Sequence, residues 1–212
     1  MLTAAEPSAP VQMVILAGGL GTCLRPLTER YPKSMIPVLE KPFIDHQLKP
    51  LASSGIQEVI LSTGYLGERI EAFVGDEKKR GLPIHTVDEG PNLRGTAGAL
   101  SWVYDQNLLH DRFLLTSGDF YLPVDYAQLW RAFQSESAPA LTSVLKNSSQ
   151  WDTRNACFDG KRVTLDDKRI QPKPKDMLLN DYGLSAFQKE HTQRFYEIRS
   201  LQGIQDLEEY LA

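Results

Sequence analysis

Cysteines, long apolar runs and excess positive charge are all scarce in this sequence. Its two cysteines among 212 residues, Cys23 and Cys157, form neither a disulfide framework nor a metal-binding spacing, and they suit a reducing cytoplasm. No apolar run approaches the about 20 residues that a membrane-spanning helix needs. The net charge of −4 gives no basic surface of the kind that binds nucleic acid. We therefore expect a cytoplasmic protein whose partners include neither a membrane nor nucleic acid, with the oligomeric state left open.

The length of the chain favours one domain with a sizeable core. The first ten residues, MLTAAEPSAP, lack the charged and apolar regions of a signal peptide, so we expect residues 1–10 to be a flexible arm. Residues 11–212 are then the domain itself. We find no internal repeat and no low-complexity segment that would divide it.

Predicted strands and helices alternate through the first two thirds of the chain. Apolar, β-branched runs predict strands at 11–18, 58–64, 82–87, 112–119 and 139–145. Helical spacing predicts helices at 43–55, 66–75, 95–109 and 125–137, with Pro50 awkward in the first and Asp125 as a capping residue of the last. This alternation indicates βαβ units. The expected fold class is α/β, with a Rossmann-like, doubly wound and mostly parallel sheet.

The pattern changes after about residue 150. Residues 156–168 predict a hairpin that turns at Asp159-Gly160, and residues 177–187 predict a further strand. The last residues predict an amphipathic helix, because Leu201, Ile204, Leu207 and Leu211 share one helical face.

A glycine-rich turn, GGLGT at residues 18–22, follows the first predicted strand. Ligands of doubly wound sheets bind beyond the carboxyl ends of the strands, and glycines let backbone N–H groups approach a phosphate closely. The turn therefore predicts a phosphate-binding loop. Two common patterns do not fit it: the dinucleotide pattern G-x-G-x-x-G meets Leu24 at its third glycine, and no Gly-Lys pair completes a P-loop.

The segment LAGGLGTCLRPLTERYPK, residues 16–33, extends well beyond the glycine turn. It resembles the signature of sugar-phosphate nucleotidyltransferases, L-A-G-G-x-G-T-R-x-x-P-x-T-x-x-x-P-K, and departs from it only at the arginine, which is Cys23 here. The resemblance implies a single-domain fold of the nucleotide-diphospho-sugar transferase type. It places a nucleotide-binding part at about 11–125 and a sugar-binding part at about 126–212. The most similar members are small enzymes of the mannose- and heptose-1-phosphate guanylyltransferase type.

Later segments are similar to further motifs of this family. VDEGPNLRGTAGAL (87–100) resembles the second nucleotide-binding loop, and SGDFYLPVD (117–125) resembles the Gly-Asp whose aspartate holds Mg²⁺. VTLDDKR (163–169) and LLNDYGLSAF (178–187) resemble the segments that meet the sugar phosphate and the sugar. Residues 195–200, FYEIRS, are similar to a closing motif whose glutamate takes the place of a second metal-binding aspartate.

The implied reaction joins two polyanions. A sugar 1-phosphate oxygen attacks the α-phosphorus of a nucleoside triphosphate, which gives a nucleoside-diphosphate sugar and pyrophosphate. Such chemistry depends on alignment and charge neutralisation, for which Mg²⁺, carboxylate ligands and nearby cations are suited.

The resemblance assigns a role to each candidate residue. The residues expected to act in catalysis are Lys33, Asp119 and Arg25, and those expected to bind Mg²⁺ are Asp119 and Glu197. Sugar-phosphate binding falls to Lys168, Asp181 and Gly183. Nucleotide binding falls to Leu16, Ala17, Gly18, Gly19, Gly21, Thr22, Cys23, Glu89, Gly95 and Thr96.

Three departures from the family pattern favour an alternative. Cys23 cannot supply the fixed cation of the family arginine, although Arg25 or Arg94 could compensate for it. A second interpretation of Cys23 is a reactive thiol, for which no partner cysteine or histidine lies nearby in the sequence. Arg199 replaces a glycine, and the short segment 188–194 stands where relatives carry a longer insert. The alternative to the enzyme is therefore a non-catalytic protein that binds a nucleotide or nucleotide sugar.

Overall fold

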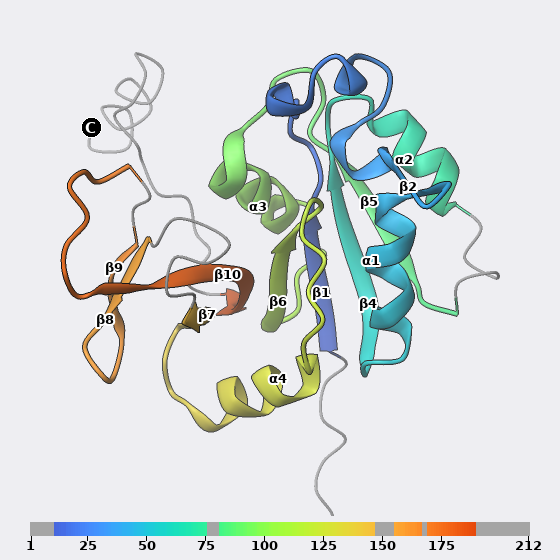
Figure 1. Ribbon diagram of the computed structural model, residues 1–212. Helices are drawn as coiled ribbons and strands as arrows, with labels where there is room; N and C mark the ends of the chain where they lie inside the picture. The colour runs from blue at the N-terminus through green and yellow to red at the C-terminus, as the bar shows by residue number, and fades with distance from the viewer. Residues whose placement is uncertain (1–10, 76–80, 147–154, 167–168, 190–212) are drawn as a thin grey trace, which may run out of the picture.

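Four parallel strands form the centre of the molecule. The computed structural model describes residues 11–75, 81–146, 155–166 and 169–189. Within this part, β5 (Ile84–Asp88), β4 (Ile56–Thr63), β1 (Val11–Leu16) and β6 (Arg112–Ser117) lie side by side in that order (Figure 1). Because β1 was expected to end at a glycine turn, its central position places that turn in the middle of the sheet edge.

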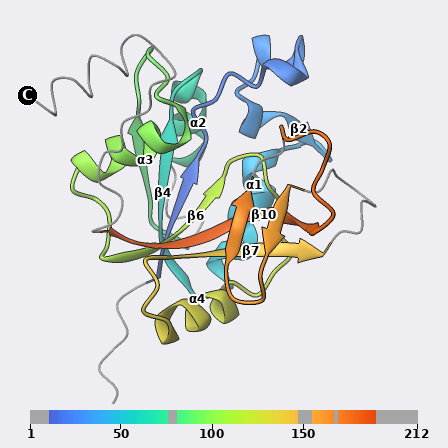
Figure 2. The same cartoon turned by 90° about the vertical axis from the view of Figure 1, so that its left-hand side faces the viewer.

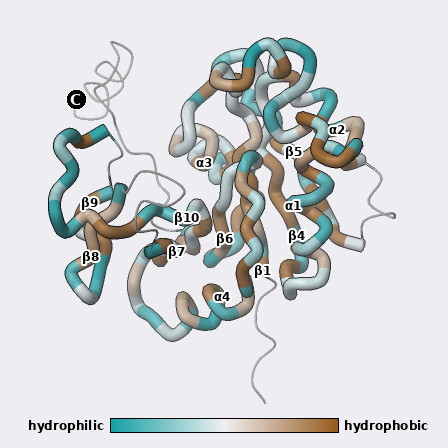
Figure 3. Tube along the Cα trace, in the orientation of Figure 1, coloured by the Kyte–Doolittle hydropathy of each residue, from teal (hydrophilic) through white to brown (hydrophobic). Residues whose placement is uncertain are grey.

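Both faces of the parallel strands are buried, and the alternation of side chains along β1 shows why. Met13 and Ile15 point into one apolar cluster and Val14 into another, all with no exposed surface. In Figure 3 the central strands are accordingly mostly hydrophobic. Parallel strands need such cover on both faces, and the helices provide it.

The helices divide between these two clusters. Side chains of α1 (Phe43–Ala52), α2 (Gly67–Val74) and α4 (Tyr126–Ser135) join the cluster of Met13. Leu100 and Val103 of α3 (Gly95–Asp105) join the cluster of Val14 on the opposite face. The predicted helices are thus confirmed, although each ends one to four residues before the expected end, and Pro50 lies in the last turn of α1. The cap is also confirmed, since Asp125 Oδ1 accepts the backbone N–H of Gln128 at 3.0 Å.

The second half of the sheet is antiparallel. β10 (Met177–Gln188) pairs antiparallel with β6, with β7 (Ala140–Lys146) and with β8 (Ala156–Phe158), which pairs in turn with β9 (Val163–Asp166). Figure 2 shows β10 and β7 side by side, running across the direction of the parallel strands. The parallel order expected from the βαβ pattern therefore stops at β6, because β10 occupies its free edge. The strand at 139–145 is present, but it pairs with β10.

The predicted hairpin at 156–168 is confirmed over the described residues. β8 and β9 are joined by a turn in which Asp159 Oδ1 accepts the backbone N–H groups of Lys161 and Arg162, each at 2.8 Å. These hydrogen bonds lower the pKa of the Asp159 carboxyl, since they favour its charged form.

The segment between β1 and α1 holds structure that the sequence did not predict. Three short 3₁₀ helices, η1 (Thr22–Leu24), η2 (Leu27–Glu29) and η3 (Lys33–Met35), are followed by a small hairpin of β2 (Pro37–Val38) and β3 (Lys41–Pro42). These pieces turn the chain back across the end of β1. They carry the proline and lysine positions of the signature to the sheet edge.

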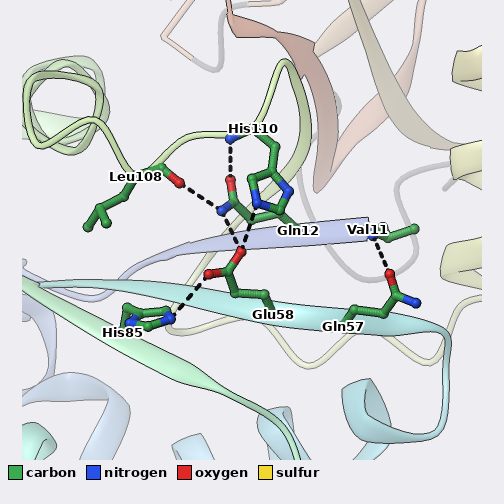
Figure 4. Close-up of polar contacts among 7 residues, drawn as sticks. All are labelled: Val11, Gln12, Gln57, Glu58, His85, Leu108 and His110. Atoms are coloured by element: carbon green, nitrogen blue, oxygen red, sulfur yellow. Dashed lines mark hydrogen bonds and ion pairs between the residues drawn. The ribbon is translucent and has the colours of Figure 1, made fainter. Parts of the chain in front are cut away.

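A polar cluster fastens the opposite, amino-terminal edge of the parallel strands (Figure 4). Gln12 is fully buried, and its Nε2 donates to Glu58 Oε2 and to the Leu108 carbonyl, each at 2.9 Å. Its Oε1 accepts the backbone N–H of His110 at 3.0 Å. The imidazoles of His85 and His110 lie 3.2 and 3.1 Å from the two carboxylate oxygens of Glu58. The Gln12 side chain thus links β1, β4 and the loop before β6.

Among the helices of the described residues, none is both long and apolar enough to cross a bilayer. The predicted arm at 1–10 and the predicted helix of Leu201, Ile204, Leu207 and Leu211 lie outside the described residues. The proposed division of the domain near residue 125 stays a prediction.

Candidate functional site

A cavity of about 310 Å³ opens at the carboxyl ends of the central strands. It is bounded by the glycine turn after β1, the start of α3 and the loop after β6. Most of the residues predicted from the sequence line this cavity: Leu16, Ala17, Gly18, Gly19, Gly21, Lys33, Glu89, Gly95, Thr96 and Asp119. Segments far apart in the chain therefore meet at one place, and the roles assigned to them stay predictions.

The glycine turn lies too close to its neighbours for side chains at two positions. A Cβ at Gly18 would lie 2.4 Å from Glu89 Oε1. Gly21 has a left-handed φ of +59°, and its Cβ would lie 2.8 Å from Thr28 Cγ2. Thr28 is buried beneath the turn, and its hydroxyl donates to the Gly21 carbonyl at 3.0 Å. Thr28, the threonine of the signature, thus supports the turn on the side away from the cavity. The other side of the turn backbone stays open to the cavity.

Lys33 and Asp119 form an ion pair in the wall of the cavity. Lys33 begins η3, and Asp119 follows β6 after a single glycine, so 86 residues separate them in the chain. Both side chains are about 30% exposed. The pair thus brings a cation and a carboxylate together in the cavity wall.

Glu89 is a buried carboxylate in the same wall, with 6% of its surface exposed. Its Oε1 accepts the hydroxyl of Ser62 at 3.2 Å, and its Oε2 accepts the backbone N–H of Arg94 at 3.3 Å. An ionised carboxylate has about four acceptor positions, so two neutral donors leave capacity for a ligand. Ser62 was not predicted, since a serine inside an apolar strand carries no motif.

Of the predicted residues that the structure describes, Thr22, Cys23 and Arg25 do not line the cavity. They follow Gly21 in η1 and at its end, where Cys23 is exposed. Arg94 does not line it either, and its guanidinium lies 4.3 Å above the ring of Trp102. The suggestion that Arg25 or Arg94 replaces the missing arginine therefore gains no support from the cavity wall.

Two of the predicted sugar-phosphate residues, Asp181 and Gly183, lie on β10. Gly183 has a φ of +81°, and its Cβ would lie 2.4 Å from the ring of Phe120, the residue after Asp119. Asp181 Oδ1 accepts the backbone N–H of Gly183 at 2.9 Å. Neither residue lines the cavity. Lys168 and Glu197 lie outside the described residues.

The chemistry of a divalent cation fits Asp119 in one respect. Mg²⁺ is commonly held by one or two carboxylates together with substrate phosphates and water. Asp119 is a partly exposed carboxylate in a wall that also holds the glycine turn and Lys33. Among the described residues, no group of three His, Cys, Asp or Glu side chains forms a complete protein site. A cation here would therefore need ligands beyond Asp119, such as phosphate oxygens and water.

The cavity also includes residues that were not predicted: Ser34, Leu93, Ala99, Ser117 and Gly118. Each adjoins or nearly adjoins a predicted residue in the chain, so adjacency was the available signal. Ser34 is 1% exposed, and its hydroxyl has no hydrogen-bond partner within the described part of the chain.

Comparisons with known proteins agree with this geometry. The family model described as Nucleotidyl transferase matches residues 12–155. The chain is 38% identical to a mannose-1-phosphate guanylyltransferase of Mycobacterium tuberculosis over 136 residues, which are 64% of this chain and 37% of the relative. It is 31% identical to D-glycero-alpha-D-manno-heptose 1-phosphate guanylyltransferase of Aneurinibacillus thermoaerophilus over 166 residues, 78% of this chain and 68% of the relative. The chain thus spans well under half of the mycobacterial enzyme.

Solved structures share the fold. HddC from Yersinia pseudotuberculosis in complex with GMP-PN aligns with a TM-score of 0.69 at 22% identity, covering 91% of this chain and 85% of that one. A glucose-1-phosphate thymidylyltransferase structure from Bacillus anthracis aligns with a TM-score of 0.73 at 21% identity, covering 94% and 82%. The signature, the match along most of the chain and the arrangement of the cavity lead to one conclusion: this chain belongs to the nucleotidyl transferase family of sugar-1-phosphate nucleotidyltransferases.

Proposed function

We propose that this chain transfers a guanylyl group from GTP to a sugar 1-phosphate, with Mg²⁺ as cofactor, giving a GDP-sugar and pyrophosphate. The observation that carries the proposal is the ion pair of Lys33 and Asp119 in the wall of a cavity that begins with the glycine turn. Relatives named for mannose- and heptose-1-phosphate guanylyl transfer support the choice of substrates.

The phosphates would be bound by backbone and by one cation. The open backbone of Gly18, Gly19 and Gly21 offers N–H groups to the triphosphate. Lys33 neutralises the charge where the two phosphates meet. Asp119 would hold Mg²⁺, which when bound supplies charge neutralisation on the phosphate oxygens.

The base would be recognised by Glu89. Guanine presents adjacent N–H donors on one edge, and the Glu89 carboxylate lies in the cavity wall with acceptor capacity left after its contacts with Ser62 and Arg94. The other common bases present a single donor group on that edge, so they would form fewer hydrogen bonds with the carboxylate than guanine does.

The test is pyrophosphate release with Mg²⁺ across the four common nucleoside triphosphates and mannose-, heptose-, glucose- and N-acetylglucosamine-1-phosphate. We expect turnover with GTP and mannose- or heptose-1-phosphate. Lys33→Met is expected to lower kcat/KM by about 10²- to 10³-fold, the loss typical of one donor to developing charge. Lys49→Met, an exposed lysine of α1, is the matched control. If the folded protein releases no pyrophosphate with any pair of substrates in the panel, the proposal is contradicted.

A second candidate function rests on Cys23. A neutral, exposed thiol stands at the arginine position of the signature, and no arginine of the described residues lines the cavity. Loss of one fixed cation can remove catalysis while the backbone cradle still binds a nucleotide. Calorimetric binding of GTP by a protein that is silent in the panel would favour this non-catalytic role.

A further inference from the structure

We propose that Gln47 is a positioning residue that fixes the loop carrying Asp119, an inference that rests on the proposed function. Gln47 lies in α1 and is 3% exposed. Its Nε2 donates to the Ser117 carbonyl at 2.9 Å and to the Phe120 carbonyl at 3.0 Å. These two carbonyls flank Gly118 and Asp119, so one amide holds both ends of the short loop.

The orientation of the amide is decided by its partners. Carbonyl oxygens only accept, so the atom that faces both of them must be the NH₂ group. The other end of the side chain, Oε1, is then buried without a donor among the described residues. A buried oxygen without a partner is unfavourable, and an apolar residue would avoid it. Packing in α1 therefore does not explain a glutamine here, whereas the two hydrogen bonds to the loop do.

The same helix also supports the other member of the ion pair. The backbone N–H of Phe43, the first residue of α1, donates at 3.0 Å to the carbonyl of Ile36, which directly follows η3. Lys33 begins η3. One end of α1 is thus fixed to the segment of Lys33, and the next turn is fixed by Gln47 to the loop of Asp119. The helix sets the distance between the cation and the carboxylate.

The opposite side of the loop is held by the sheet. The N–H of Gly118 donates to the Leu16 carbonyl at 2.8 Å, and a Cβ at Gly118 would lie 2.9 Å from Ala17 Cβ. This side contacts only the start of the loop. Within the loop, the N–H of Phe120 donates to the Ser117 carbonyl at 3.2 Å. Without Gln47 the loop keeps this turn and its attachment to β1 but loses both hydrogen bonds that fasten it to α1.

The experiment uses the full chain with Gln47→Met, which is similar in size but donates nothing. Hydrogen–deuterium exchange of the ligand-free protein is expected to rise at least tenfold for the amides of residues 119 and 120 and to stay unchanged in β4. In the assay, kcat is expected to fall at least tenfold, while the GTP dissociation constant changes less than twofold. Ile44→Val, a fully buried neighbour in α1, is the matched control for lost packing.

Unchanged exchange in residues 119 and 120, or changes no larger than those of Ile44→Val, would overturn the proposal. Should Gln47→Met fail to fold, Gln47→Asn serves, since its shorter side chain cannot reach both carbonyls, and the same changes are expected. If the unsubstituted chain shows no turnover, the proposed function fails, and the exchange measurement alone still decides whether Gln47 holds the loop.

Discussion

At the scale of single residues, the glycine turn and Glu89 lie too close for a side chain between them. Gly18 has an ordinary φ, so its need for glycine is steric: a Cβ would lie 2.4 Å from Glu89 Oε1. A Cβ at the neighbouring Gly19 would have no atom within 4 Å. Two adjacent glycines therefore differ in what they contribute.

Gly18→Ala is expected to displace the Glu89 carboxylate and to lower the free energy of unfolding by about 1–3 kcal/mol, the cost of overpacking. Gly19→Ala is expected to change it by less than about 0.5 kcal/mol, because its Cβ would meet open space. Urea unfolding followed by tryptophan fluorescence gives both values. Equal midpoints for the two variants would show that the contact with Glu89 is not tight.

The two cysteines differ in a second residue-scale property. Cys23 is exposed, whereas Cys157 is 3% exposed in β8. Burial raises the pKa of the Cys157 thiol, and the neighbouring Asp176 carboxylate raises it further. Because the thiolate is the reactive form, Cys157 is protected both by access and by its protonation.

Iodoacetamide at pH 8 is therefore expected to modify one cysteine of the native protein, Cys23, and to reach Cys157 only in denaturant. Mass spectrometry of peptides after labelling measures both. In Cys23→Ser the native protein is expected to take up no label. Rapid native modification of Cys157 would contradict its burial in β8.

At the scale of elements, helix α4 is an example in which a local signal decided the structure. Asp125 precedes it, and its carboxylate accepts the N–H of Gln128. Asp125 also lies 3.8 Å from the guanidinium of Arg131, but both side chains are more than half exposed. The cap and the ion pair can be separated by substitution.

Asp125→Ala is expected to lower the free energy of unfolding by about 1 kcal/mol through loss of the cap. Arg131→Ala is expected to change it by less than about 0.5 kcal/mol, because exposed ion pairs contribute little. Thermal unfolding of the two variants compares the contribution of the cap with that of the ion pair directly. A loss in Arg131→Ala as large as that in Asp125→Ala would assign the stability to the ion pair instead.

The elements also show where the sequence was informative. Short apolar, β-branched runs predicted every parallel strand, because both faces of such a strand must be buried, and helical spacing predicted the helices between them. The three 3₁₀ helices and the β2–β3 hairpin were missed, since pieces of two or three residues have no periodicity to detect. The pairing of β7 with β10 was missed for another reason: pairing partners depend on which edge is free, and β10 comes later in the chain.

At the scale of the whole molecule, different groups of residues lie at the carboxyl ends and at the amino ends of the parallel strands. The carboxyl edge holds the cavity with Lys33, Asp119 and Glu89. The amino edge holds the polar cluster around Gln12, in which no residue lines that cavity. Substitutions at the amino edge are therefore expected to affect stability without affecting ligands.

Gln12→Leu is expected to lower the free energy of unfolding by about 1–3 kcal/mol, because the Leu108 carbonyl and the His110 N–H lose their partner in a partly buried place. The matched control is Gln57→Leu, whose exposed side chain accepts only the Val11 N–H among the described contacts. Calorimetry gives the stability, and titration with GTP gives the affinity. A change in affinity greater than twofold in folded Gln12→Leu would show that the two edges are coupled.

The sequence by itself determined the family and the strand–helix alternation, because the signature at 16–33 and the apolar runs are local patterns that need no partner to be recognised. It also named ten residues that line the cavity. Only the tertiary structure decided that Cys23 and Arg25 lie outside the wall, that Arg94 stacks on Trp102, and that Gln47 supports the loop of Asp119. The physical reason is that hydrogen bonds and contacts between segments far apart in the chain depend on how the helices cross the sheet, which no local pattern records.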